Sequence, residues 1–183
     1  MTVKDVIYYA SIMCGKEDLA EKIISGVIPD DNADVVRMLN CYNLTVSELS
    51  EHIEPLVFTE TLSSDDGEYR YVDFTKPPKQ ILKVTCGGKN VDYTVCRDKV
   101  VTGVTRCEIT YDYRAKRVSS LSDEIEYDEN VFSPRVLAMG VASEFLLISG
   151  AYEECASWRS RYDNAVETYL ISKTRKIKQR RWA

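Results

Sequence analysis

The chain has 183 residues, of which 44% are hydrophobic and 29% are charged, and these values are ordinary for a globular protein. Its length suffices for one domain or for a core with one insertion, and no internal repeat or low-complexity segment is present. The formal net charge is −5, yet six positive charges and no acid follow Ser172, so the rest of the chain carries −11. An acidic body with a basic tail indicates that the tail has a partner of its own.

The first third of the chain is patterned for helices. Apolar residues at helical spacing predict short helices over residues 2–14 and 16–25, each closed by a glycine. A longer helix, capped by Asp31 or Asn32, is expected to reach residue 53.

The middle of the chain changes to an alternating pattern that is rich in valine, threonine and tyrosine. Glycine-containing turns separate the alternating runs, which favours a half-buried antiparallel sheet. The predicted strands are residues 57–62, 68–74, 80–85, 91–96 and 105–113.

A helical hairpin is predicted after an acidic link at residues 123–129. Ser133 is a suitable N-cap, Pro134 suits the first helical position, and Gly150 can end the helix. The residues that we expect to pack in the bundle or between subunits share helical spacing: Leu137, Val141, Phe145, Ile148, Trp158 and Tyr162. The second helix continues this pattern as a seam of Cys155, Trp158, Tyr162, Ala165 and Tyr169, which we expect to lie along the seam around Tyr42.

The order of these elements predicts an α+β protein, in which a helical bundle formed by the two chain ends carries an antiparallel β-rich insertion. The expected parts are the N-terminal helices of the bundle, the insertion, the C-terminal hairpin and a basic arm. They span residues 1–55, 56–130, 131–172 and 173–183.

The sequence carries little that points to chemistry, and we assign no catalytic residue, no metal ligand and no cofactor. The six cysteines lack CxxC spacing and the single histidine, His52, has no evident catalytic partners, so a zinc site or a triad is not expected. An enzyme is therefore not predicted, although Glu124 and Glu126 leave open a peptidoglycan hydrolase that uses paired carboxylates.

The location of the protein is constrained by its apolar runs and its cysteines. The longest apolar run, 136–148, has 13 residues and includes Glu144, whereas a membrane span needs about 20, so no membrane partner is expected. The chain begins without a basic-then-apolar signal segment, and we expect reduced, cytosolic cysteines.

The basic tail is the most informative polar feature, and two readings of it remain open. It could contact nucleic-acid phosphates while its tryptophan stacks on a base, as in a DNA-binding accessory protein. It could instead be an arm that docks on a partner protein. The residues that would carry this contact are Lys173, Arg175, Lys176, Ile177, Lys178, Arg180, Arg181 and Trp182.

Four stretches carry a resemblance to a known family. The chain reads Ile-Leu-Lys-Val at 81–84, Gly-Gly-Lys-Asn-Val-Asp-Tyr at 87–93 and Ile-Thr-Tyr-Asp-Tyr-Arg at 109–114, before the hairpin of 133–165. These stretches and the basic tail resemble the head-to-tail adaptor (connector) proteins of tailed bacteriophages. The resemblance covers roughly residues 80–183 and, more loosely, the first helices.

The resemblance implies a structural virion protein that is assembled in the bacterial cytoplasm. Such adaptors form a homo-oligomeric ring, commonly dodecameric, between the capsid portal and the tail or nozzle proteins. The ring extends the channel through which double-stranded DNA passes without specific binding. Carried onto this sequence, residues 173–183 form the arm that docks on the portal, and the hairpin packs within and between subunits.

Overall fold

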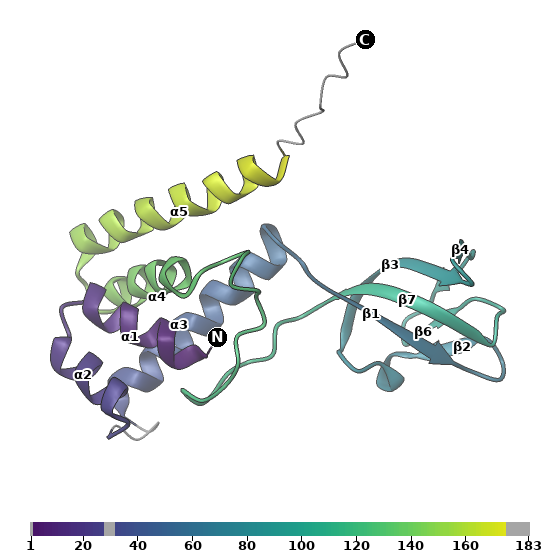
Figure 1. Ribbon diagram of the computed structural model, residues 1–183, viewed down its shortest axis with the longest axis horizontal. Helices are drawn as coiled ribbons and strands as arrows, with labels where there is room; N and C mark the ends of the chain where they lie inside the picture. The colour runs from purple at the N-terminus through teal and green to yellow at the C-terminus, as the bar shows by residue number, and fades with distance from the viewer. Residues whose placement is uncertain (1, 28–31, 175–183) are drawn as a thin grey trace, which may run out of the picture. The chain divides into compact units, whose positions relative to one another are not determined.

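The structure, a computed structural model, describes residues 2–27 and 32–174. These residues form an α+β protein with helices at both ends of the chain and antiparallel strands between them, as the sequence predicted (Figure 1). The helices are α1 (Val3–Met13), α2 (Glu17–Ser25), α3 (Ala33–His52), α4 (Pro134–Ile148), α5 (Tyr152–Thr174) and the 3-10 helix η1 (Tyr71–Asp73). The strands are β1 (Leu56–Ser63), β2 (Glu68–Arg70), β3 (Pro78–Cys86), β4 (Lys89–Asn90), β5 (Thr94–Val95), β6 (Lys99–Val101) and β7 (Arg106–Tyr113).

The chain divides into two compact units. The helical unit comprises Met1–Val46 and Arg117–Ala183, and the strand unit comprises Ser47–Lys116. The link that follows the strands therefore groups with the helices. Hydrogen bonds explain this, because Lys4 N donates to Leu121 O and Val3 N donates to Asp123 O, each at 2.9 Å.

Local signals in the sequence place the helix ends. Asn32 Oδ1 accepts from Asp34 N at 3.1 Å, so Asn32 is the cap that begins α3. Ser133 Oγ accepts from Val136 N at 3.4 Å, and Pro134 occupies the first turn of α4. Gly150, at φ +80°, takes the left-handed conformation that lets the chain turn from α4 into α5.

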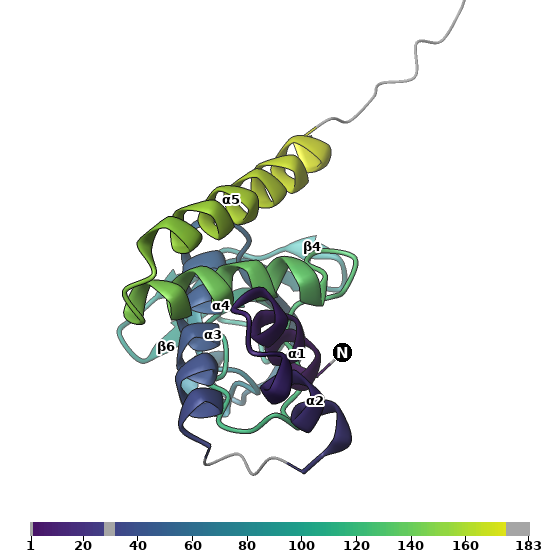
Figure 2. The same ribbon diagram turned by 90° about the vertical axis from the view of Figure 1, so that its left-hand side faces the viewer.

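The core of the helical unit is built around α4. Helix α1 packs on α2 and α4, and α5 lies along the other side of α4 (Figure 2). Gly140 of α4 marks the closest approach, because a Cβ atom there would lie 2.5 Å from Thr45 Cγ2 of α3 and 3.0 Å from Tyr162 Cε2 of α5. Helix α4 thus lies between the Tyr42 seam of α3 and the α5 seam that was expected to pack against it.

The strand unit contains two antiparallel sheets with the strand orders β1-β7-β3-β4 and β2-β6-β5. Strands β1 and β7 pair without a register shift from Leu56↔Tyr113 to Ser63↔Arg106. Tyr69 and Val100 of the smaller sheet are buried, and so is Ile109 of the larger sheet. Tyr69 Oη donates to Val104 O at 2.7 Å, shortly before β7 begins.

Two predicted strands are shorter than the sequence suggested. The strand expected over 68–74 ends at Arg70, because Phe74 N donates to Tyr71 O and turns residues 71–73 into η1. The strand expected over 91–96 is limited to Thr94–Val95. The sequence also missed β4 and β6, and Lys99–Val101 is the central strand of the smaller sheet.

Candidate functional site: the surface of helix α5

Helix α5 is long and poorly covered. It runs for 23 residues, yet Tyr162 and Val166 are the two buried residues among 152–173. Helix α4, with 15 residues, has eight buried ones. A helix covered on such a narrow stripe leaves most of its surface available to another molecule.

The residues expected to pack in the bundle divide into three groups. Leu137, Val141, Phe145 and Tyr162 are buried, as predicted. Trp158 is half-buried. Ile148 does not pack within this chain: it is 64% exposed, because it lies in the last turn of α4, where the chain leaves the core for the hairpin turn.

Three apolar residues near the hairpin turn between α4 and α5 are exposed, Leu147, Ile148 and Tyr152, and they are called the turn cluster here. Their exposed fractions are 48%, 64% and 69%. Large apolar side chains that lie together at a surface are typical of contact sites between proteins. Helical spacing predicted that Ile148 lies on the core face of α4. At this last turn of the helix, the neighbouring elements leave its side chain exposed.

Charged side chains hold α5 against α4 and shield its aromatic rings. Arg159 Nη1 lies 3.6 Å from Glu144 Oε1 of α4, and Arg159 Nε lies 3.1 Å from Asp163 Oδ1. The guanidinium of Arg161 lies 4.7 Å from the centre of the Trp158 ring, a cation–π distance. Trp158 therefore has a partner within its own helix, although the rest of the chain leaves it half-covered.

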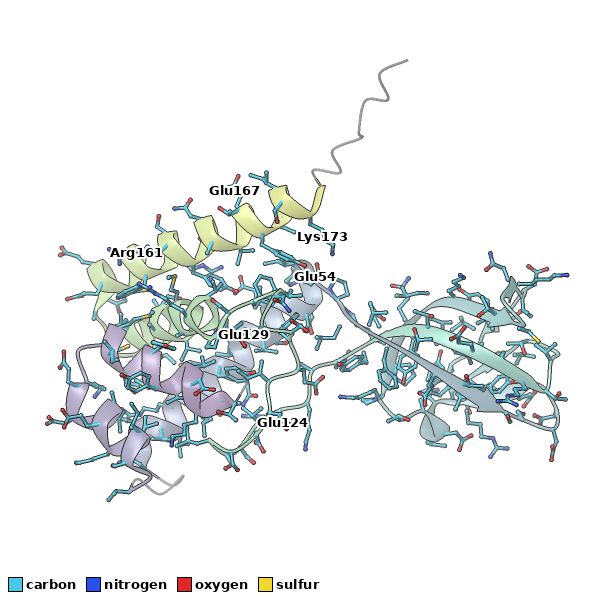
Figure 3. The ribbon with its side chains drawn as sticks, viewed as in Figure 1. Glu54, Glu124, Glu129, Arg161, Glu167 and Lys173 are labelled. Atoms are coloured by element: carbon cyan, nitrogen blue, oxygen red, sulfur yellow. The ribbon has the colours of Figure 1, made fainter. Side chains whose placement is uncertain are left out.

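The C-terminal part of α5 leads toward the basic tail. The Tyr169 and Phe132 rings lie 4.9 Å apart and tie this end of the helix to the link before α4. Lys173 is exposed in the last turn, and Figure 3 labels it on α5 with Arg161 and Glu167. The other predicted arm residues lie outside the described part of the chain: Arg175, Lys176, Ile177, Lys178, Arg180, Arg181 and Trp182.

The histidine and the acidic residues that could take part in catalysis do not form a common site in the described part of the chain. His52 is exposed at the end of α3. Asp123 Oδ2 accepts from Ser119 N at 2.8 Å and from Ser120 N at 3.0 Å, which is a turn-capping arrangement. Glu124 and Glu129 lie on different stretches of the link (Figure 3). Within residues 2–27 and 32–174, no group of three or more histidine, cysteine or acidic side chains is arranged to hold a metal ion.

Two thiols, that of the half-buried Cys14 and that of the buried Cys41, are not activated as nucleophiles. Burial raises the pKa of the Cys14 thiol to about 12 and that of the Cys41 thiol to about 11. A thiol with a raised pKa is a weaker nucleophile at neutral pH, because the thiolate is the reactive form. The structure thus makes Cys41 a core residue and leaves Cys14 half-buried at the end of α1.

Comparison with known proteins adds no family. No protein-family model matches the chain, and no curated protein is significantly similar to it. Among the described helices, none combines the length and the apolar character that crossing a lipid bilayer requires.

Proposed function

We propose that this protein is a structural subunit of a tailed bacteriophage. In this role, copies of the chain assemble through α5 into a ring between the capsid portal and the tail, and the ring extends the DNA channel. The basic arm after Ser172 docks on the portal. The proposal involves no catalysis and no cofactor.

The observation that carries this proposal is the exposed surface of α5. At about 1.5 Å per residue, its 23 residues form a helix about 35 Å long. Tyr162 and Val166 are buried, and they occupy only a small part of that length. The turn cluster lies at its start, and Leu170 and Ile171, 36% and 44% exposed, lie near its end. A neighbouring helix that packed along α5 would cover apolar residues at both ends.

The charge distribution supports the same role. The chain before Lys173 carries −11, and an acidic wall repels the phosphates of DNA instead of binding them. The six positive charges of the tail are separate from this body and suit an acidic surface on a partner protein.

The ring contact is tested with a bulky side chain on the exposed face of α5. Ser160→Trp should keep the helical circular dichroism of the wild type but lose ring formation in native mass spectrometry, because the indole blocks the approach of a neighbouring helix. Asp65→Trp, in an exposed turn of the strand unit, is the matched control and should still form rings. Equal ring formation by both variants would remove α5 from the interface.

The arm is tested by truncation. A chain that ends at Ser172 should keep its fold and lose attachment to purified portal, whereas removal of the last two residues alone separates the contribution of Trp182 from that of the charges. Normal attachment by the shorter chain would show that the arm has no role in docking.

The six positive charges also favour a second candidate, a DNA-binding accessory protein. That function predicts binding of double-stranded DNA that weakens steeply with salt and that is lost on truncation at Ser172. The ring proposal predicts no such tail-dependent affinity at 50 mM salt, so a single titration separates the two.

A further inference from the structure

Strand β1 is a long strand at the edge of its sheet. The order β1-β7-β3-β4 places it beside β7 on one side, and no other described strand pairs with its opposite side. An edge strand presents unpaired N–H and C=O groups to any chain that approaches in an extended conformation. Natural sheets usually protect such edges.

The other edges of the strand unit carry that protection. Strand β3, next to the two-residue β4, begins with Pro78 and includes Lys79 and Lys83. Its pairing with β7 shifts register twice, between Pro78/Gln80 and between Ile81/Lys83. Proline, lysine and bulges each disfavour the addition of a strand. The edge strands of the smaller sheet, β2 and β5, have three and two residues and are protected by shortness.

Strand β1 has none of these features. Its eight residues, Leu56–Ser63, contain no proline and no basic residue, and its register with β7 is unbroken. Its single charge, Glu60, is tied to its own unit. The Glu60 carboxylate accepts hydrogen bonds from Thr75 N at 3.0 Å, Thr75 Oγ1 at 2.7 Å and Tyr111 Oη at 2.5 Å.

The side chains of β1 specify what would pair with it. On the face that carries Glu60, the residues two positions away on either side are Phe58 and Leu62, and all three are half-buried. The centre of the Phe58 ring lies 6.1 Å from that of Tyr111 and 6.4 Å from that of Tyr113, both in edge contact, and Phe58 is half-buried. An added strand would complete the burial of the two apolar side chains and place one residue beside Glu60.

We infer that β1 binds an extended segment of another protein by strand addition, and that the segment presents an apolar, a basic and an apolar residue at alternate positions beside Phe58, Glu60 and Leu62. Main-chain hydrogen bonds supply the affinity, and the alternate side chains supply the specificity. This inference goes beyond the proposed ring and does not depend on it.

A second copy of β1 is a poor occupant of this edge. In an antiparallel pair of identical strands, residues opposite each other lie on the same face of the sheet. In a two-fold symmetric pair the same face of both copies lies on one side of the sheet, so every register that pairs five or more β1 residues places Glu60 opposite Leu56, Phe58, Leu62 or another Glu60. Each of these arrangements sets a carboxylate against an apolar side chain or a like charge, and a basic residue from a different chain removes that conflict.

The test uses the full chain and the labelled peptide Thr-Val-Thr-Lys-Thr-Leu-Thr, blocked at both ends. Binding should slow amide hydrogen exchange in residues 56–63 and leave residues 78–86 unchanged. Two further peptides carry N-methyl groups on alternate residues, one on each edge of the strand. One of them should bind like the parent and the other at least roughly tenfold more weakly, because a strand pairs through one edge and loses several hydrogen bonds there.

The charge requirement has its own control. Replacing the lysine of the peptide by glutamate should weaken binding by roughly 1.5- to 5-fold, the range of a cross-strand charge pair. Glu60→Gln should abolish this preference for lysine, and Lys83→Gln, on the protected edge, should leave it unchanged.

Four results would overturn the inference. They are the absence of binding at millimolar peptide, equal binding of both N-methylated peptides, protection at residues 78–86 in place of 56–63, and the same affinity for the lysine and glutamate peptides. Concentration-dependent protection of residues 56–63 without any peptide would identify a second copy as the occupant and would also reject it.

Discussion

Gly140→Ala is the substitution that most directly probes the centre of the helical unit. The new methyl group would lie 2.5 Å from Thr45 Cγ2, 3.2 Å from Thr45 Oγ1 and 3.0 Å from Tyr162 Cε2. Thr45 is 2% exposed, and its hydroxyl donates to Cys41 O at 3.0 Å. Because a β-branched side chain has few rotamers in a helix, Thr45 cannot move aside without losing that bond or shifting α3.

Two opposing effects set the change in unfolding free energy that Gly140→Ala causes. Overpacking a buried site costs about 1–3 kcal/mol, while replacing glycine by alanine inside a helix gains about 1 kcal/mol. A contact of 2.5 Å with a side chain that has no room to rotate belongs at the upper end of the first range. We therefore expect Gly140→Ala to lower the free energy of unfolding by about 1–2 kcal/mol.

Urea unfolding followed by circular dichroism measures this change, and a double-mutant cycle assigns its cause. Thr45→Ser removes the nearest atom, Cγ2, and keeps the hydroxyl, so Gly140→Ala should cost about half as much in that background. An unfolding free energy at or above the wild-type value in the single variant would refute the close approach of α3, α4 and α5. If Gly140→Ala lowered the unfolding free energy equally in both backgrounds, the new methyl group would not clash with Thr45.

Two further predictions concern the helical unit. Asn43 holds the link through both atoms of its amide, since Nδ2 donates to Val118 O at 3.0 Å and Oδ1 accepts from Val118 N at 2.9 Å. Asn43→Ala should lower the unfolding free energy by about 1–3 kcal/mol, whereas Asn40→Ala, at an exposed position, should change it by less than about 0.5 kcal/mol; equal urea midpoints would contradict this. Because the fold holds the thiols of Cys14 and Cys41 protonated where the unfolded chain ionises, stability should fall as the pH rises from about 9 to about 11. Cys41→Ser should make this decline shallower in urea titrations at pH 8 to 10.5, and an unchanged slope would argue against the burial of that thiol.

The helices were predictable because their signals are local. Asn32, Ser133, Pro134 and Gly150 each act within a turn of their own position, and the structure uses all four as the sequence suggested. The short strands were harder to predict, because Lys99–Val101 lies between Asp98 and Thr102-Gly103 and lacks a long alternating run. That strand exists because β2 and β5 pair with it from both sides, and such pairing is not encoded within the strand itself.

Features of the candidate surfaces also depend on other parts of the chain and not on local sequence signals. Gly140 has no side chain to keep neighbouring helices apart, but the residues that approach it, Thr45 and Tyr162, come from other parts of the chain and are known only from the structure. Periodicity placed Ile148 on the core face, but coverage depends on where neighbouring helices end, so its exposure could not be foreseen. The edge position of β1 likewise depends on the order of strands in the sheet and not on its own residues.

We propose that copies of this chain pack through α5 into a ring that carries a docking arm. Electron microscopy of the purified protein mixed with portal particles tests it most directly, with Ser160→Trp prepared in parallel. We expect a ring stacked on the portal with the wild-type protein and bare portals with the variant. Bare portals with the wild-type protein, or stacked rings with both proteins, would contradict it.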